Sequence, residues 1–408
     1  MTHSNSKGAR EAELFAALRS ILNSSLGRAP GLAQQLKGVD VAALRSREAL
    51  AQAPVLRKSE LAAMQEKSPP FGGLVTREPR ELKRLLVSPG PIFEPEGEGA
   101  DWWGAAAAFS AAGFRRGDVV LNAFSYHLTP GGHIMESGAF ALGCSVIPGG
   151  VGNSEQQVEA IHRLRPDGYS GTPDFLKILL DKAAELGRDA SSIKRALVSG
   201  AALPASLRAE LESRGVKTRQ AYASADLGVI AFETDLADGS LDEGMAVNEG
   251  LILEIVVPGT GDPVAPGAAG EVVVTRLNPD YPLLRFATGD ISRFVDAPTP
   301  RIKGWLGRAD QTTKVRGMFV HPSQIAEIRR RHRELGALRL IVNRDGEQDR
   351  MILRAETAAP SASLREAVAA TLQAVTNLRG LVEFVPMGDL PNDGKIISDE
   401  RPAGSGAS

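Results

Sequence analysis

Apolar positions near the start of the chain recur at helical spacing. Leu14, Leu18, Ile21 and Leu22 fall on one face of a helix with 3.6 residues per turn. The segments that follow, up to about residue 67, are equally amphipathic. The pattern therefore predicts a run of helices over residues 9–67.

From about Gly117 the pattern changes to short apolar runs that alternate with longer amphipathic stretches. Alternation of strands with helices of this length is typical of a largely parallel sheet that is covered on both faces, so we expect an α/β fold. Strands are expected at Val119–Phe124, at Ser145–Pro148, near Tyr169 and at Arg195–Gly200. Helices are expected between them, over residues 131–143, 154–164 and 173–186.

A third pattern begins at Gly250. Two apolar runs, Leu251–Val257 and Gly270–Leu277, are joined by a Pro- and Gly-rich segment, which predicts a pair of antiparallel strands. After Asp310 the remaining runs predict a small α+β unit with one helix over Ala362–Leu378. We expect a large layered domain over residues 1–307, a small mobile domain over 308–400, and a disordered tail over 401–408.

Bulk properties exclude several classes of function. The 408 residues are 43% hydrophobic and 24% charged, and the formal net charge of −2 gives no reason to expect a nucleic acid or a membrane surface as partner. Cys144 is the only cysteine, so neither an intrachain disulfide nor a multi-cysteine zinc site can form. The N-terminus lacks an apolar signal core, and no run approaches the length of about eighteen apolar residues that suggests a membrane span. We expect a cytoplasmic protein.

The segment Gly307–Ile328 carries the most specific pattern in the chain. A Gly-Arg-x-Asp turn that ends at Asp310 precedes a short strand-like run, a second glycine (Gly317) and a predicted helix start. Glycines on both sides of a charged turn suit a backbone that swivels. The segment resembles the hinge between the two domains of acyl-CoA synthetases, and most closely that of the phenylacetate–CoA ligase branch. The alternative is an ordinary strand–turn–helix connection.

Four further segments resemble the same family in the same order, over roughly residues 117–395. The first begins NAFSYHLTPGGHI at Asn122 and is similar to the family's substrate segment. The resemblance implies that Gly131 and Gly132 let the backbone approach a flat acyl group, with Tyr126 or His127 as its wall. The alternative is a helix N-terminus with core aromatic side chains.

The second segment comprises LVSGAALP (Leu197–Pro204) and RQAYASADLG (Arg219–Gly228), which resemble the family's adenine-binding strand ends. Ligands of open α/β sheets bind beyond the carboxyl ends of the strands, where both stretches fall. The resemblance implies that Gly200 and Ala201 approach the base and that Tyr222 stacks on it.

The same stretch departs from the family pattern at three positions. Ala223 replaces a glycine, and Ala225 replaces the usual Thr or Ser, which leaves Ser224 as the hydroxyl for the α-phosphate. Asp226 stands where the family has a glutamate that helps hold magnesium. A carboxylate suits Mg²⁺, although Asp reaches one methylene less than Glu.

The third segment, PLLRFATGDIS (Pro282–Ser292), matches the family's Tyr-Arg-Thr-x-Asp pattern, with Phe286 and Ala287 in place of the first two residues. The resemblance implies that Asp290 accepts hydrogen bonds from both ribose hydroxyls, assisted by Arg308. Without the resemblance, this stretch is a turn with a surface aspartate.

The fourth segment, LPNDGKIISD (Leu390–Asp399), resembles the loop that brings a catalytic lysine to the acyl-adenylate. Two anions, a carboxylate and the α-phosphate of ATP, meet in that step, and the ammonium of Lys395 offsets their repulsion. A solvated lysine near the C-terminus is the alternative.

One family feature is absent. Where a Ser/Thr/Gly-rich phosphate loop is expected, the chain reads VSPGPIFEPEGEGADWW, Val87–Trp103. Its prolines lack N–H donors, and its carboxylates place negative charge where polyphosphate is expected to lie. Three interpretations stay open: the acidic residues hold magnesium, ATP is used poorly, or the segment is an ordered turn without a ligand. The residues concerned are Pro89, Pro91, Pro95, Glu94, Glu96, Glu98 and Asp101.

Other catalytic motifs are missing. The chain has no GxSxG, HExxH, Walker-type or GxGxxG motif, and its six histidines show no pair at metal-ligand spacing with a cysteine, so we expect no zinc.

Together the segments imply an ATP-dependent carboxylate–CoA ligase that uses ATP, Mg²⁺ and coenzyme A on an aromatic or arylacetic acid. Dimerisation through the large domain is a further family expectation. Two alternatives remain: an acid-adenylating enzyme with a non-CoA acceptor, and a non-catalytic descendant that binds a nucleotide or an acyl ligand.

Overall fold

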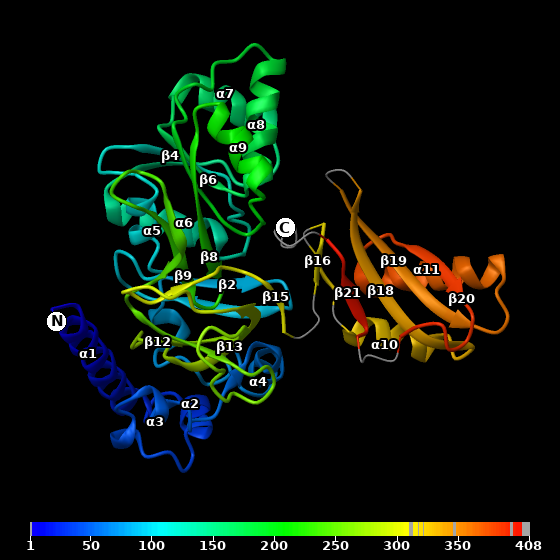
Figure 1. Cartoon of the computed structure of the whole chain (residues 1–408), viewed down its shortest axis with the longest axis horizontal. Helices are drawn as coiled ribbons and strands as arrows, with labels where there is room; N and C mark the ends of the chain where they lie inside the picture. The colour runs from blue at the N-terminus through cyan, green and yellow to red at the C-terminus, as the bar shows by residue number, and fades with distance from the viewer. Residues whose placement is uncertain are drawn as a thin grey trace. The chain divides into compact units, whose positions relative to one another are not determined.

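The computed structural model describes residues 2–309, 313–316, 318–320, 322–345, 348–391 and 395–401. The chain divides into two compact units, Met1–Leu306 and Gly307–Ser408, and each is described by itself (Figure 1). Within these ranges no helix has the length and apolar character needed to cross a membrane.

The N-terminal helices pack against the smaller sheet of the first unit. Phe15 and Leu18 of α1 (Thr2–Ser25) are buried in one cluster with Ile252 and Leu284 of that sheet. The predicted helical run is interrupted by one short strand, β1 (Leu56–Arg57), whose backbone pairs with a strand of the smaller sheet. The remaining elements are α2 (Pro30–Gln35), a 3₁₀ helix (Val41–Ala43), α3 (Arg47–Leu50), a second 3₁₀ helix (Lys58–Glu60) and α4 (Leu61–Lys67).

The larger sheet has the strand order β14-β10-β9-β8-β7-β6-β4-β5. The half from β8 to β5 is parallel, and β8, β9, β10 and β14 pair antiparallel. This confirms the predicted alternation of strands and helices. Its strands are β4 (Val119–Asn122), β5 (Ser145–Pro148), β6 (Gly168–Gly171), β7 (Arg195–Val198), β8 (Lys217–Ser224), β9 (Gly228–Asp235), β10 (Leu241–Val247) and β14 (Arg301–Ile302). Its helices are α5 (Ala106–Ala111), α6 (Gly131–Leu142), α7 (Ser154–Leu164), α8 (Pro173–Glu185) and α9 (Ala205–Ser213).

The smaller sheet follows the path β1-β13-β12-β11. As predicted, β11 (Leu251–Val256) and β12 (Gly270–Arg276) are antiparallel neighbours. β13 (Leu283–Ser292) pairs antiparallel with β12 and parallel with β1, in the register Leu56–Phe286 and Arg57–Ala287. The smaller sheet therefore joins the N-terminal segment to the strand that carries Asp290.

The segment expected to bind phosphate forms a hairpin of β2 (Arg84–Ser88) and β3 (Ile92–Glu96). Pro89 and Pro91 lie in the turn, whereas Pro95 lies within β3, opposite Leu85, in a two-stranded sheet whose edge strands tolerate proline. TGD, expected as a turn without the family resemblance, lies within β13 instead.

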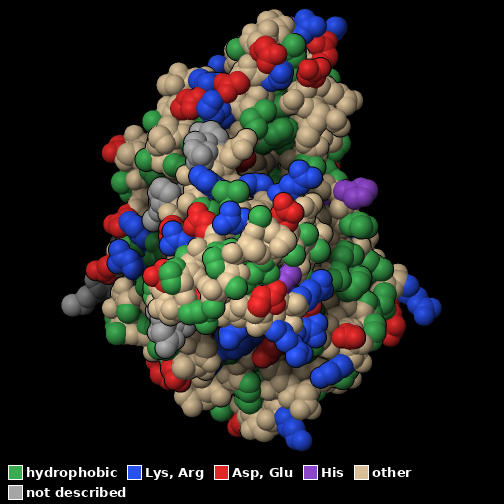
Figure 2. Space-filling model, turned by 90° about the vertical axis from the view of Figure 1, so that its right-hand side faces the viewer, with side chains coloured by type: hydrophobic (Ala, Val, Ile, Leu, Met, Phe, Trp, Pro, Cys, Tyr) green, Lys and Arg blue, Asp and Glu red, His purple; other side chains and the backbone are tan. Residues whose placement is uncertain are grey.

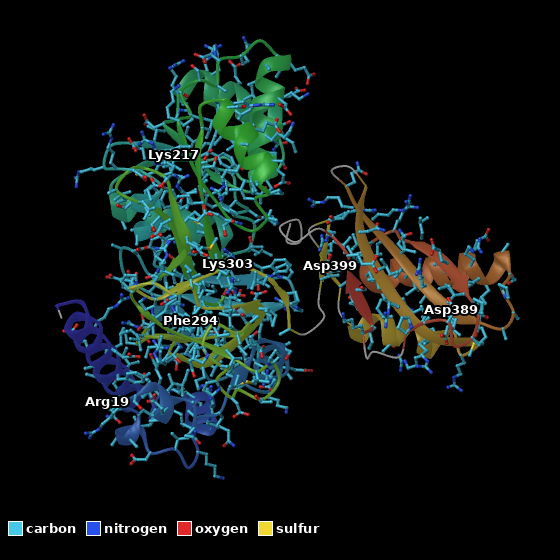
Figure 3. All side chains as sticks on the ribbon, in the orientation of Figure 1. Arg19, Lys217, Phe294, Lys303, Asp389 and Asp399 are labelled. Atoms are coloured by element: carbon cyan, nitrogen blue, oxygen red, sulfur yellow. The ribbon has the colours of Figure 1, made fainter. Side chains whose placement is uncertain are left out.

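The second unit has its own core of apolar side chains around the sheet β20-β19-β18-β21. Asp399 of β21, which is labelled in Figure 3, accepts a hydrogen bond from Thr313 at 2.6 Å and forms an ion pair with buried Arg401. Its elements are β15 (Gly307–Arg308), β16 (Thr313–Val315), β17 (Met318–Val320), α10 (Pro322–Arg331), β18 (Leu335–Asp345), β19 (Gln348–Thr357), α11 (Ala362–Thr376), β20 (Leu381–Val385) and β21 (Ile397–Asp399). Figure 2 shows acidic and basic side chains mixed on one face, in agreement with the small net charge.

Candidate active site

Tyr222 and Asp290 meet between the two sheets of the first unit. The Tyr222 hydroxyl donates to Asp290 Oδ2 at 2.7 Å, and Trp305 Nε1 donates to Asp290 Oδ1 at 3.1 Å. Thr288 lies beside them, with its Oγ1 3.3 Å from the Tyr222 hydroxyl. The side chains of Tyr222, Asp290 and Trp305 are half-buried, and that of Thr288 is buried. Both oxygens of Asp290 are thus oriented by the protein at a position that remains accessible.

The strand ends predicted to approach adenine lie alongside each other. β7 and β8 are parallel neighbours, so Gly200 and Ala201, which follow β7, lie next to the last residues of β8. Gln220 donates from Nε2 to the carbonyl of Ala201 at 3.1 Å. Gly200 has φ +75°, which a glycine adopts without strain. The edge between the two strands is therefore held in place by the protein itself.

The hydroxyl expected at the α-phosphate has a local role. Ser224 Oγ accepts a hydrogen bond from the Leu227 backbone at 3.3 Å and so supports the turn that carries Asp226. Ala223 lies in β8 beside it and is half-buried. A phosphate contact from Ser224 stays a prediction.

The predicted acyl segment surrounds Tyr126. Its hydroxyl accepts from Asn122 at 2.7 Å and donates to Glu136 at 3.3 Å, and its ring meets that of His133 edge to face at 5.2 Å. Burial and the nearby Glu136 carboxylate raise the pKa of Tyr126. His127 is exposed. Tyr126 is accordingly the better-anchored of the two predicted wall residues.

The two glycines of this segment differ in their surroundings. A Cβ on Gly132 would lie 2.8 Å from the Tyr126 ring and 2.8 Å from the Ser125 carbonyl oxygen, whereas a Cβ on Gly131 would have no neighbour closer than 3.8 Å. Gly132 thus makes room for Tyr126, a contact within the protein that the family pattern did not reveal.

Asp226 is fully buried and is paired with a lysine from the N-terminal segment. Lys58 Nζ lies 2.6 Å from Asp226 Oδ2, and Lys58 is 33% exposed. Asp226 Oδ1 has no hydrogen-bond partner among the described residues. Beneath this pair, the buried guanidinium of Arg276 donates to the Asp226 carbonyl at 3.1 Å and lies 3.8 Å from the centre of the Trp102 ring.

Comparison with known proteins identifies the family. Residues 102–278 match the model for AMP-binding enzymes. The phenylacetate–coenzyme A ligase of Thermus thermophilus is 30% identical over 345 residues, which cover 79% of this chain and 75% of that protein. The chain belongs to the phenylacetate–CoA ligase family. The enzyme of that name from Aromatoleum evansii is 29% identical over 344 residues, or 78% of this chain and 75% of its own. Membership confirms the predicted family and the predicted enzyme class, an AMP-forming acid–thiol ligase.

Solved structures confirm the predicted fold. The chain resembles a 2-hydroxyisobutyryl-CoA ligase in complex with 2-HIB-AMP and CoA, with a TM-score of 0.79 and 23% identity over 97% of this chain and 90% of that one. It also resembles an amide bond synthetase from Marinactinospora thermotolerans, with a TM-score of 0.57 and 18% identity over 95% and 93% of the two chains. At these identities the likeness concerns the fold alone.

The surroundings of Asp226 test whether the magnesium ion implied by the family fits this chain. One carboxylate oxygen is paired with Lys58, and the side chain has no exposed surface. Burial and the Asp226 charge raise the pKa of Glu94 to about 8, which disfavours the ionised form of this carboxyl. Mg²⁺ retains several waters and prefers ionised carboxylates. These side chains therefore do not fit a hydrated Mg²⁺.

Three of the four carboxylates of the β2–β3 region accept hydrogen bonds within the protein, and the fourth, that of Glu98, is exposed. Glu94 accepts from the Ser88 backbone at 3.0 Å, Glu96 accepts from Arg84 at 2.8 Å, and Asp101 accepts from the first backbone N–H groups of α5. The described residues contain no cluster of three or more His, Cys, Asp or Glu that could hold a metal ion. Of the three interpretations, the contacts favour an ordered structural hairpin.

The family's hinge and lysine segments belong to the second unit. Asp310 and Gly317 lie outside the described residues. Arg308 is half-buried, and Lys395 is exposed, with its carbonyl accepting from Arg339 Nε at 3.1 Å. The ribose role of Arg308, the hinge roles and the catalytic role of Lys395 stay predictions.

Sequence reasoning missed three residues of the first-unit site: Lys58, Thr288 and Trp305. Thr288 lies within a quoted motif, two positions before Asp290. Trp305 lies outside every motif that resembles the family, although an aromatic donor shortly before the hinge is a recognisable signal. Lys58 gives no signal, because its role depends on the pairing of β1 with β13.

Proposed function

We propose that this chain is an ATP-dependent carboxylate–CoA ligase for an aromatic or arylacetic acid. In the first step the carboxylate attacks the α-phosphorus of ATP, the acyl-adenylate forms and pyrophosphate leaves. In the second step the CoA thiol, losing its proton, attacks the acyl carbon, so that the thioester forms and AMP leaves.

The observation that carries the proposal is the clamped carboxylate of Asp290. Tyr222 and Trp305 each donate to a different oxygen, which fixes the plane of the carboxylate. Each oxygen has a further lone pair, and a carboxylate suits the two neighbouring hydroxyls of a ribose. The ends of β7 and β8, with Gly200 and Ala201, then lie where a base attached to that ribose would bind.

An aromatic acyl group is supported by the surroundings of Tyr126. The rings of Tyr126 and His133 meet edge to face, and a further flat ring can join such a pair through the same quadrupole attraction. The hydroxyl of Tyr126 is held by Asn122 and Glu136, which fixes the ring as a wall. The phenylacetate in the names of the curated relatives agrees with this substrate class.

Lys395 is proposed to assist the first step. Its ammonium offsets the repulsion between the acid and the α-phosphate and stabilises charge that develops on the phosphoryl oxygens. Rotation of the second unit about Asp310 then withdraws Lys395 and brings the Gly317 side to the CoA thiol. Arg308 is proposed to join Asp290 at the ribose.

Carboxylate-dependent exchange between ATP and pyrophosphate tests the first step. We expect exchange with aromatic or arylacetic acids and little with short aliphatic acids. Lys395→Ala is expected to lower exchange on the order of 10²–10³-fold, the loss typical of a removed preorganised charge partner. Arg350→Ala, at an exposed arginine of the same unit, is the matched control.

The second step is tested by supplying preformed acyl-adenylate with CoA or with an amine. CoA-dependent release of AMP that is faster than amine-dependent release supports the ligase, and the reverse identifies a non-CoA acceptor. Absence of exchange with every acid, despite measurable ATP binding, contradicts the proposal. Exchange that survives Lys395→Ala contradicts the assignment of that lysine.

A further inference from the structure

We propose that the Lys58 ammonium is the resident cation on the phosphate side of the nucleotide site, serving at Asp226 in place of a divalent metal ion. The inference rests on the proposed function, because it concerns the nucleotide that this function uses. Lys58 lies outside the residues that match the AMP-binding family model.

The backbone places Lys58 beside the ribose strand. β1 pairs in parallel with β13, with Leu56 opposite Phe286 and Arg57 opposite Ala287. The chain then enters the 3₁₀ helix that begins at Lys58 and that contacts β13. In β13, Ala287 is followed directly by Thr288, two residues before Asp290. The strand that holds the ribose carboxylate therefore also fixes the position of Lys58.

The pair is exposed on one side only. Asp226 has no exposed surface, whereas a third of the Lys58 side chain is exposed, so Lys58 is the member of the pair that faces solvent. A buried carboxylate at 2.6 Å holds the ammonium in one position. An ammonium fixed in this way can donate a charge-assisted hydrogen bond to a phosphate oxygen.

The neighbouring hairpin explains why such a cation is required. Pro89 and Pro91 have no N–H groups, so the hairpin cannot supply the run of backbone donors that a Ser/Thr/Gly-rich loop offers. Asp226 lies four residues after Tyr222, whose hydroxyl contacts Asp290. Lys58 thus provides positive charge on the phosphate side of the site, where backbone donors are lacking.

Calorimetric titration of the full chain with ATP, in EDTA and in excess Mg²⁺, tests the inference. We expect wild-type ATP affinity to agree within about twofold in the two conditions. Lys58→Ala is expected to weaken ATP binding in EDTA by at least about tenfold, as for a lost hydrogen bond between charged groups. Mg²⁺ is expected to restore part of that affinity, because the variant frees the Asp226 carboxylate.

Two controls separate a ligand contact from a structural ion pair. Arg57 also pairs with a buried carboxylate, that of Glu271 at 3.2 Å, and Arg57→Ala is expected to leave ATP affinity unchanged. Adenosine, which lacks phosphates, is expected to bind wild type and Lys58→Ala equally. If Lys58→Ala does not fold, Lys58→Ala with Asp226→Asn removes the buried charge and is expected to show the same loss in EDTA.

Three results overturn the inference. The first is a wild-type affinity for ATP that falls tenfold or more in EDTA. The others are a Lys58→Ala variant with wild-type ATP affinity and a wild-type chain that binds no ATP. These readouts need no carboxylic acid and no turnover. Failure of pyrophosphate exchange is therefore distinguishable from failure of the Lys58 assignment.

Discussion

The Tyr222 hydroxyl donates a 2.7 Å hydrogen bond to Asp290 and thereby joins a strand of the larger sheet to a strand of the smaller one. Tyr222→Phe keeps the ring for stacking and removes only this donor. A hydrogen bond to a charged group contributes about 1.5–3 kcal/mol, so we expect AMP affinity to fall about tenfold or more. Calorimetry of AMP binding measures the change.

A comparison of AMP with 2′-deoxy-AMP identifies which part of the nucleotide Asp290 contacts. Wild type is expected to prefer AMP, and Asp290→Ala is expected to lose that preference. Equal binding of both ligands by wild type argues against a ribose contact. An unchanged preference in Asp290→Ala assigns the contact to another residue.

Gly132→Ala is expected to impair acid binding, whereas Gly131→Ala is not. The new methyl group at 132 meets the Tyr126 ring at 2.8 Å, and the ring must move; at 131 the nearest atom is 3.8 Å away. We expect the KM for the acid in pyrophosphate exchange to rise about tenfold for the first variant only, since a loss of about 1.4 kcal/mol corresponds to tenfold. Equal effects of both variants contradict Tyr126 as the wall.

Stability is expected to fall with rising pH because of Glu94. Its ordinary pKa of 4.5 is raised to about 8 in the folded protein, so the folded state holds a proton that the unfolded state has lost between these values. The contribution is fully present below pH 4.5 and is lost as the pH rises through about 8. Glu94→Gln mimics the neutral form, so its unfolding temperature is expected to exceed that of wild type more at pH 8 than at pH 5. A pH-independent difference contradicts this assignment.

Arg276→Lys is expected to destabilise the first unit. The guanidinium donates to two carbonyls, those of Trp102 and Asp226, and stacks on Trp102, which a lysine cannot reproduce. Breaking a buried charged network costs about 3–5 kcal/mol, and we expect a loss near the lower value. All three tryptophans lie in the first unit, so tryptophan fluorescence during urea unfolding reports on it. Arg163→Lys, at an exposed helical ion pair, is the control and is expected to change stability by less than about 0.5 kcal/mol.

Local pattern was sufficient to predict most of the architecture. The alternation after Gly117 and the antiparallel pair after Gly250 were confirmed, because each depends on periodicity within a short stretch. β1 was missed, because only two residues pair there and the partner strand is remote in sequence. The periodicity of apolar side chains within a segment cannot reveal a pairing between two remote segments.

Motif matching named candidate residues for a nucleotide site but did not reveal the contacts between them. Tyr222 and Asp290 were named separately, and their hydrogen bond became evident only when the two sheets were in place. The sequence pattern predicted that the carboxylates of Val87–Trp103 place negative charge where a phosphate ligand would lie. Burial and the partners Ser88 and Arg84 give Glu94 and Glu96 structural roles instead, which no linear pattern records.

The parallel pairing of Arg57 with Ala287 has a consequence for how the protein is made. More than half of the chain separates these two residues. At a synthesis rate of about 5–20 residues per second, the segment that carries Lys58 leaves the ribosome roughly 10–50 s before its partner strand does. During that interval the apolar face of α1 has no sheet to cover, and the segment must stay soluble by itself or with a chaperone. The proposed nucleotide site therefore cannot form until late in synthesis, after β13 has been made.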